Sequence, residues 1–154
     1  MQSQKRQSTI APLRPASRAA GERDRPEAAA GVPKVLVIDD DALVRRTICR
    51  ILEHGGYQVA VAEDGAEGAA KFRSEQPDLV ITDIIMPEQE GIETIMAMLR
   101  ENPRARIVAV SGGGRLGSLD FLTVARKLGA KETLRKPFEP AELLGCVSRA
   151  LAAA

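Results

Sequence analysis

Residues Lys34 to Asp41 read "KVLVIDDD", and this stretch sets the pattern for the rest of the chain. Apolar side chains fill consecutive positions from Val35 to Ile38, with no alternation of apolar and polar residues. Such a run is typical of a short parallel strand that is buried on both faces. The run ends in carboxylates, so the predicted strand places acidic side chains at its carboxyl end.

A helix is predicted directly after this strand. Val44, Ile48, Ile51 and Leu52 recur at helical spacing and form one apolar stripe, and the glycines of "HGGY" then stop the helix. The same alternation continues to the end of the chain. Further strands are predicted at 58–62, 77–83, 106–111 and 131–135, and further helices at 64–74, 90–103, 118–128 and 140–154.

Five strand–helix units in about 120 residues predict an α/β fold. Strands that alternate with helices form a parallel sheet covered on both faces, and right-handed crossovers make this a doubly wound sandwich. In such sheets, functional residues lie beyond the carboxyl ends of the strands.

The first 32 residues differ in composition from the rest of the chain. Residues 1–32 are rich in Pro, Ala, Ser, Arg and Gly, and they carry six basic and three acidic residues. Their large aliphatic side chains, Ile10 and Leu13, cannot offset the entropy of ordering the segment. We therefore predict a disordered basic tail over 1–32 and one folded domain over 33–154. A basic docking arm or a transit-like presequence are the alternatives for the tail.

Charge and cysteine content narrow the function further. The net charge of +1 gives no reason to expect nucleic acid or a membrane surface as a partner. Cys49 and Cys146 lack the spacing of a metal site, and free thiols fit a reducing cytoplasm. The sequence has no apolar run long enough to cross a bilayer and no secretory signal at its polar start.

Polar groups follow four of the predicted strands at their carboxyl ends. They are Asp39, Asp40 and Asp41 after the first strand, Asp83 at the end of the third, Ser111 at the end of the fourth, and Lys136 just past the fifth. If the first and third strands are neighbours, the carboxylates meet in one pocket, with a hydroxyl and an ammonium group at its rim.

Packed carboxylates repel one another unless a cation joins them, and Mg²⁺ is the small, hard cation that prefers oxygen ligands. Mg²⁺ and lysine together neutralise a phosphoryl group during transfer, and a carboxylate can act as the nucleophile and form an acyl phosphate. We interpret these residues as a magnesium-dependent site for phosphoryl transfer to an aspartate. Solvated acids at strand ends explain any one of the residues, but not the whole set.

Four blocks of the sequence resemble the response-regulator receiver domain of two-component signalling. They are "VLVIDDD", "ITDIIMPEQEG", "AVSGGG" and "LRKPF", and the resemblance covers about residues 33–154. It implies a flavodoxin-like (βα)5 three-layer sandwich with strand order 2-1-3-4-5. It also implies a stand-alone phosphoacceptor of a His–Asp phosphorelay, without an output domain and without enzymatic activity beyond its own phosphorylation and dephosphorylation.

The resemblance assigns the acidic residues their roles. Asp83 would accept the phosphoryl group from a phosphohistidine, and it would also be a magnesium ligand. Asp40 and the main-chain carbonyl of Ile85 would bind Mg²⁺ directly, while Asp39 would hold the ion mainly through water. Asp41 matches no ligand of the family and is expected at the surface.

The resemblance also implies a phosphorylation switch. Ser111 and Lys136 would each bind a phosphoryl oxygen, and the peptide between Lys136 and Pro137 would be cis. Many receivers have an aromatic switch residue where this chain has Thr133, which cannot swing a ring inward behind Ser111. We therefore expect the permissive backbone at Gly112 and Gly113 to act as the hinge.

Two departures from the family pattern bear on the lifetime of the phosphorylated state. Ile85 and Gly113 occupy positions where polar side chains can position the attacking water in relatives. Neither residue can do so, and slow hydrolysis of the acyl phosphate is the resulting hypothesis.

Other functions fit the residues less well. The glycines of "SGGGRLG" (111–117) match a dinucleotide-binding pattern, but that pattern belongs after the first strand, where this chain has acids. A phosphatase of the haloacid dehalogenase type would use Asp39 and Asp41 but would leave Asp83 without a role. A receiver that acts only as a phosphorylation-independent scaffold would not need the complete polar set.

The expected partners follow from this interpretation. They are a sensor histidine kinase or a histidine phosphotransfer protein, and a downstream protein that binds the face of the fourth helix, fifth strand and fifth helix. Neither nucleic acid nor membrane is expected as a partner. The chain is expected in the cytoplasm as a monomer or as a dimer that depends on phosphorylation.

Overall fold

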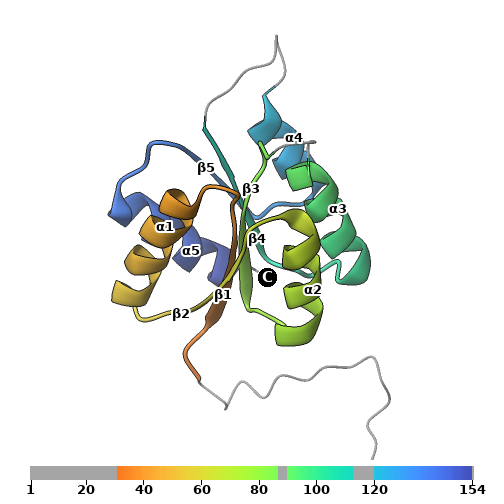
Figure 1. The fold of residues 1–154 in the computed structure, drawn as a ribbon. Helices are drawn as coiled ribbons and strands as arrows, with labels where there is room; N and C mark the ends of the chain where they lie inside the picture. Colours follow the sequence, from red (N-terminus) through yellow and green to blue (C-terminus); the bar gives the residue numbers. More distant parts are fainter. Residues whose placement is uncertain (1–30, 87–89, 113–119, 154) are drawn as a thin grey trace, which may run out of the picture. The chain divides into compact units, whose positions relative to one another are not determined.

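A computed structural model describes residues 31–86, 90–112 and 120–153 of the 154-residue chain. In the described part, five strands alternate with five helices (Figure 1). The strands are β1 (Lys34–Ile38), β2 (Gln58–Ala62), β3 (Leu79–Asp83), β4 (Ile107–Ser111) and β5 (Glu132–Arg135). The helices are α1 (Ala42–His54), α2 (Gly65–Glu75), α3 (Glu90–Glu101), α4 (Phe121–Leu128) and α5 (Pro140–Ala152).

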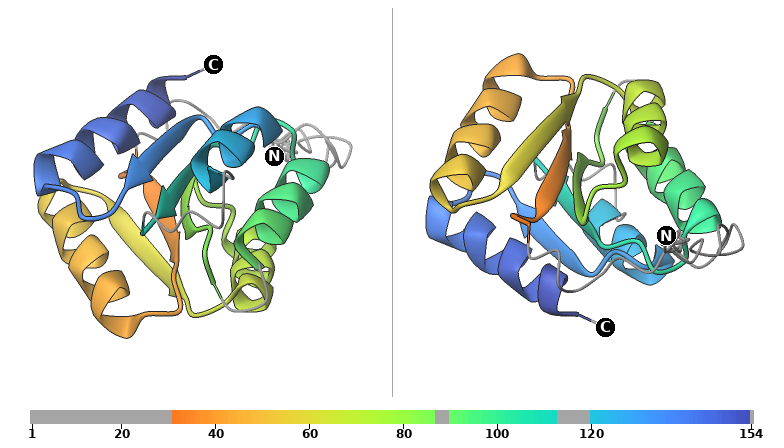
Figure 2. Two further views of the ribbon diagram at one scale, coloured as in Figure 1. Left: turned by 90° about the horizontal axis from the view of Figure 1, so that it is seen from above. Right: turned by 90° about the horizontal axis from the view of Figure 1, so that it is seen from below.

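The strands form one parallel sheet in the order β2-β1-β3-β4-β5. Helices α1 and α5 cover one face of this sheet, and α2, α3 and α4 cover the other (Figures 1 and 2). The predicted α/β class, three layers and strand order are therefore confirmed. Strands β1 and β3 are neighbours, as the predicted carboxylate pocket requires.

The apolar run that opens the domain is buried on both sides of the sheet. Val35 and Val37 pack with the residues under α1 and α5, whereas Leu36 and Ile38 pack with the residues under α2, α3 and α4. All four side chains are at most 1% exposed. Burial on both faces explains why the run shows no alternation of apolar and polar residues.

Aspartates begin three of the helices. Asp41, Asp64 and Asp120 each accept a hydrogen bond from a main-chain N–H in the first turn of α1, α2 and α4, respectively. This capping satisfies N–H groups that have no partner within the helix. The fourth helix is predicted from residue 118, and residues 118 and 119 lie outside the described residues; Asp120 is the extended residue that caps α4, so α4 begins at Phe121.

The folded domain is anchored at its beginning by main-chain contacts. The amide of Gln58 donates to the Pro33 carbonyl at 3.0 Å, and the Lys34 amide donates to the Asp78 carboxylate at 2.8 Å. Residues 1–30 of the predicted tail over 1–32 lie outside the described residues. Gly113, which is predicted to be part of the hinge, also lies outside them. Within the part of the chain that the structure describes, the helices are too short or too polar to cross a membrane.

Candidate functional site

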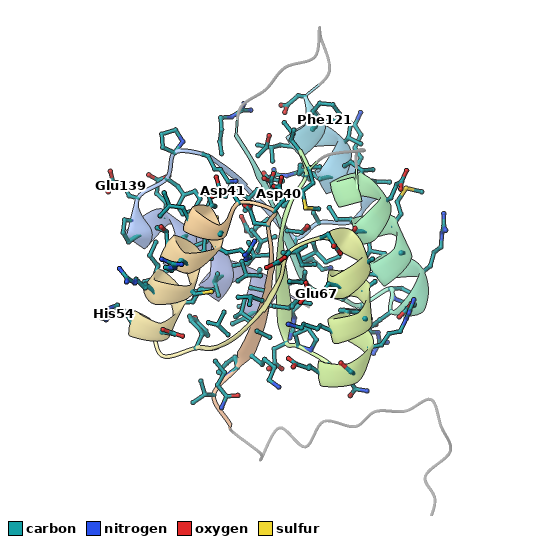
Figure 3. All side chains as sticks on the ribbon, viewed as in Figure 1. Asp40, Asp41, His54, Glu67, Phe121 and Glu139 are labelled. Carbon is teal, nitrogen blue, oxygen red and sulfur yellow. The ribbon has the colours of Figure 1, made fainter. Side chains whose placement is uncertain are left out.

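Three carboxylates meet at the carboxyl edge of the sheet. Asp39 and Asp40 follow β1, and Asp83 is the last residue of β3. One oxygen from each side chain lies within 4.8 Å of the others. Asp39 and Asp83 are buried and Asp40 is exposed, so the cluster opens toward solvent on the Asp40 side. Figure 3 shows Asp40 and Asp41 beside the start of α1. The structure thus brings together the residues predicted to form this pocket.

Lys136 joins the two buried carboxylates. Its Nζ donates to Asp39 Oδ2 at 2.9 Å and to Asp83 Oδ2 at 3.1 Å. Lys136 directly follows β5, and its amide donates to the Ser111 carbonyl at the end of β4 at 2.8 Å. The peptide between Lys136 and Pro137 is cis, as the resemblance implied.

The pKa values of Asp83 and Lys136 are both raised, but for different reasons. Burial raises the pKa of Asp83 above its ordinary value, and the charge of Asp39 adds to the effect, although Lys136 and the Ile85 amide oppose it. Burial alone would lower the pKa of Lys136, but its hydrogen bond with Asp39 and the charges of Asp83 and Asp39 outweigh burial and raise this pKa. Lys136 is therefore positively charged at neutral pH, whereas the charged form of Asp83 is disfavoured.

The loop between β1 and α1 holds Asp39 in place. The Asp41 amide donates to Asp39 Oδ1 at 2.9 Å, while Lys136 occupies Oδ2. The Asp41 side chain points the other way and accepts from the Leu43 and Val44 amides, which caps α1. Asp41 is exposed, as predicted, and its observed role is to start the helix.

The loop after β3 approaches the start of α3 closely. The Ile85 amide donates to Asp83 Oδ1 at 3.0 Å and orients that carboxylate. Gly91, in the first turn of α3, lies so close to this loop that a Cβ there would stand 2.4 Å from both the Asp83 carbonyl oxygen and Ile84 Cα. Only glycine fits that position, which explains the glycine in the "DIIMPEQEG" block.

The described residues predicted to form a switch lie at the end of β4 and in β5. Ser111 is buried at the end of β4, one position past the β4 partner of Asp83, and it pairs with Arg135 in β5. Thr133 is half-buried in β5, and its Oγ1 accepts a hydrogen bond of 3.1 Å from Arg126 of α4. Gly112 is exposed, and the structure places no described atom within 4 Å of a Cβ added there.

A second contact joins α4 to β5. Arg135 forms an ion pair of 3.6 Å with Asp120, the residue that caps α4. Together with the bond from Arg126 to Thr133, this pair holds α4 against β5 near both ends of the helix. Sequence reasoning identified Thr133 but missed its partner, because the pairing depends on how α4 packs on the sheet.

The described donor set of the pocket consists of hard oxygen ligands next to the Lys136 ammonium group. Carboxylate oxygens at an exposed edge, where water can complete the coordination, are the environment that Mg²⁺ prefers over softer metal ions. The carboxylate cluster of Asp39, Asp40 and Asp83 fits this chemistry. A neighbouring lysine and a buried serine add groups that can bind the oxygens of a phosphoryl group.

Comparison with protein families agrees with this geometry. The family model described as "Response regulator receiver domain" matches residues 35–148. Chemotaxis protein CheY of Thermotoga maritima is 34% identical over 117 residues, which cover 75% of this chain and 95% of that protein. Chemotaxis protein CheY of Bacillus subtilis is 34% identical over 119 residues, which cover 77% of this chain and 97% of that protein.

A solved structure agrees as well. The crystal structure of a response regulator receiver domain protein from Clostridium thermocellum superimposes with a TM-score of 0.72 at 32% sequence identity. The match covers 79% of this chain and 95% of that chain. Sequence and backbone similarity therefore extend over the same domain that contains the carboxylate cluster.

Proposed function

Because the chain belongs to the family of response regulator receiver domains, and is a phosphoacceptor of that type, we propose that Asp83 is the residue that receives the phosphoryl group. One observation supports this assignment above all. Asp83 lies where a carboxylate cluster and the Lys136 ammonium group meet, at the carboxyl edge of the sheet. A charged phosphoryl donor finds both a cation site and a lysine at that point.

In the proposed reaction, an Asp83 carboxylate oxygen attacks the phosphorus of a phosphohistidine. The new O–P bond forms as the P–N bond of the donor breaks, and the histidine leaves with the bonding electron pair and takes up a proton. Asp39, Asp40, Asp83 and the Ile85 carbonyl are the residues that would hold Mg²⁺, which supplies charge neutralisation when bound. The raised pKa of Lys136 keeps its ammonium group charged to bind a phosphoryl oxygen.

The product would carry its added charge next to Ser111 and Lys136. We assign Ser111 to a phosphoryl oxygen, because it is buried at the end of β4 beside the strand that ends in Asp83. We assign signal output to the face formed by α4, β5 and α5. Two contacts join α4 to β5, and their β5 residues are Arg135, which directly precedes Lys136, and Thr133 on the same strand. The partners are a histidine kinase or phosphotransfer protein, and a protein that binds this face.

A reducing compartment is the proposed location. Cys49 and Cys146 are both free thiols in the structure. Burial is the main cause that raises the pKa of each thiol, which leaves both in the unreactive protonated form. Such thiols fit the cytoplasm, where thiols stay reduced.

Phosphorylation with a small acyl phosphate or phosphoramidate tests the assignment of Asp83. The wild-type protein with Mg²⁺ should gain one phosphoryl group by intact mass, and the gain should disappear with a chelator. Asp83→Asn should abolish the gain, because an amide cannot form the acyl phosphate.

Asp41→Asn is the matched control, because Asp41 is an exposed acid next to the cluster whose side chain caps α1. It should retain the phosphoryl gain of the wild type. Equal phosphorylation of the Asp83→Asn variant and the wild type would show that another residue is the acceptor. Turnover of a phosphate ester that is lost with Asp39→Asn but kept with Asp83→Asn would favour a phosphatase instead.

A further inference from the structure

One arginine reaches from α1 back to the metal-binding loop. Arg45 lies in α1, and its side chain is only 13% exposed although it is charged. Its Nη1 donates to the main-chain carbonyl of Asp39 at 2.7 Å, and its Nη2 lies 3.4 Å from Glu63 Oε1 after β2. Arg46, the next residue, is exposed. The two adjacent arginines therefore stand in different environments.

The carbonyl that Arg45 holds belongs to the peptide that leads into Asp40. A peptide unit is planar, so fixing the Asp39 carbonyl also fixes the direction in which the chain enters Asp40. On the other side of Asp39, its amide donates to the Ala62 carbonyl at 3.2 Å. The Asp40 side chain is exposed, so its backbone, rather than close packing, must direct its carboxylate toward the cluster.

We propose that Arg45 is a positioning residue for the magnesium site. Its guanidinium group holds the Asp39–Asp40 peptide in the orientation that brings both carboxylates to the ion, and it does not contact the ion itself. This inference rests on the proposed function, because it assumes that the carboxylate cluster binds Mg²⁺. The roles proposed for the acidic residues leave the buried position of the Arg45 side chain unexplained, and positioning of the Asp39–Asp40 peptide explains it.

Two other roles for Arg45 predict different results. A positive charge close to a cation site repels the cation, so an arginine that acted only through its charge would weaken Mg²⁺ binding, and its removal would strengthen it. An arginine that only formed an exposed ion pair with Glu63, which is 73% exposed, would leave Mg²⁺ affinity unchanged. Only positioning predicts that removal of Arg45 weakens Mg²⁺ binding.

The test compares Arg45→Met with Arg46→Met, which removes the same charge from the neighbouring position. Mg²⁺ affinity is measured on the unphosphorylated protein by calorimetry and by the amide signal of Asp40. Arg45→Met should weaken the affinity about 10-fold, as loss of a group that orients metal ligands does, while Arg46→Met stays within about twofold of wild type. In phosphorylation with a small donor, the Mg²⁺ concentration at half-maximal rate should rise by the same factor, with a nearly unchanged rate at saturating Mg²⁺.

Arg45→Lys covers the case in which Arg45→Met does not fold. It keeps the charge and the aliphatic stem but loses the forked donor and some of its reach, so Mg²⁺ affinity should fall by about threefold or more. Unchanged or tighter Mg²⁺ binding in a folded Arg45 variant overturns the proposal, and so does an equal loss in Arg46→Met.

Asp40→Asn separates a failure of this inference from a failure of the proposed function. If the wild type binds no Mg²⁺, or if Asp40→Asn binds it equally well, the magnesium site itself is wrong and the role of Arg45 falls with it. If Asp40→Asn loses Mg²⁺ binding while folded Arg45 variants retain it, the magnesium site stands and only the role of Arg45 is wrong.

Discussion

Lys136 is one ammonium group shared by two buried carboxylates, while a third carboxylate stands beside them. The Lys136 Nζ contacts Asp39 and Asp83, and Asp40 completes the cluster on its exposed side. Without a metal ion, the site therefore holds more negative than positive charge. This imbalance favours binding of a divalent cation, and it also makes the charged form of Asp83 costly in the metal-free protein.

The raised pKa of Asp83 predicts a stability effect that depends on pH. Below the ordinary pKa of 3.8, Asp83 is protonated in the folded and unfolded states alike, and its charge costs nothing. As the pH rises through the raised pKa of the folded state, the folded protein must hold a disfavoured charge and loses stability. Without metal, Asp83→Asn should therefore have a higher Tm than the wild type at pH 7, by a few degrees, and the difference should shrink toward pH 4.

Thermal unfolding in the presence of a chelator measures this difference, and Mg²⁺ supplies the control. Added Mg²⁺ should stabilise the wild type more than Asp83→Asn, because the variant lacks one ligand. The difference in Tm between the two proteins should therefore become smaller. A metal-free wild type that is the more stable protein at pH 7 would mean that the attraction to Lys136 outweighs the cost of burial.

At the same scale, the sequence predicted which residues form the site but not how they are held. Each of Asp39, Asp83, Ser111 and Lys136 stands at or just past a strand end, so topology alone brought them together. Arg45 could not be found this way, because a charged residue early in a helix is usually solvated. Its role depends on the direction of a long side chain, which only the packed structure shows.

Among the elements, the strands were easier to predict than the start of α4. A run of apolar residues between polar ends marks β1, β3 and β4, because these central strands are buried on both faces. Helix α4 has only eight residues, and its start is decided by the Asp120 cap. The serine and glycine residues before Asp120 do not mark in the sequence where this helix begins.

The contact between α4 and β5 is a candidate link between the phosphorylation site and the proposed output face. Thr133 stands where the resemblance to the receiver family implies a switch position, and its side chain accepts a hydrogen bond from Arg126. If this bond couples β5 to α4, phosphorylation of Asp83 should change the amide signals of both residues. Thr133→Val, which keeps the shape but not the hydroxyl, should abolish the change at Arg126 while the change at Ser111 remains.

Arg149→Met is the control for this experiment, because it removes a comparable exposed contact between α5 and Glu132 of β5. It should leave the change at Arg126 intact. Since the Arg126–Thr133 bond is exposed, Thr133→Val should lower the free energy of unfolding by no more than about 1 kcal/mol. A change at Arg126 that persists in Thr133→Val would show that the signal reaches α4 by another route.

At the scale of the whole molecule, general rules of connection narrowed the possible strand orders but did not select one. Right-handed crossovers and two covered faces limit five strand–helix units to a few arrangements, and the resemblance selected the order that the structure has. The two apolar clusters on opposite faces then share the central strands. The predicted start of the folded domain at residue 33 rests only on a change of composition, because the residues before β1 form no periodic pattern.

The contacts at the start of the domain allow that boundary to be tested. Pro33 accepts a hydrogen bond from Gln58, and the Lys34 amide donates to Asp78, so contacts with the rest of the domain begin at residue 33 or before. A chain that begins at Gly31 should keep the Tm of the full chain within about 1 °C and its Mg²⁺ affinity within about twofold. Measurements are thermal unfolding and Mg²⁺ titration.

A chain that begins at Val35 is the matched control, because it lacks both of these contacts. It also lacks the Lys34 carbonyl, which accepts from the Asp78 amide at 2.8 Å. It should therefore lose about 3 kcal/mol of unfolding free energy, roughly one for each of the three hydrogen bonds. Residues 1–32 carry six basic and three acidic residues, so a tail that reached the acidic cluster would compete with Mg²⁺ for it. If the chain that begins at Gly31 bound Mg²⁺ more tightly than the full chain, most markedly at low salt, the tail would influence the site. That result would favour a basic arm that docks on the domain.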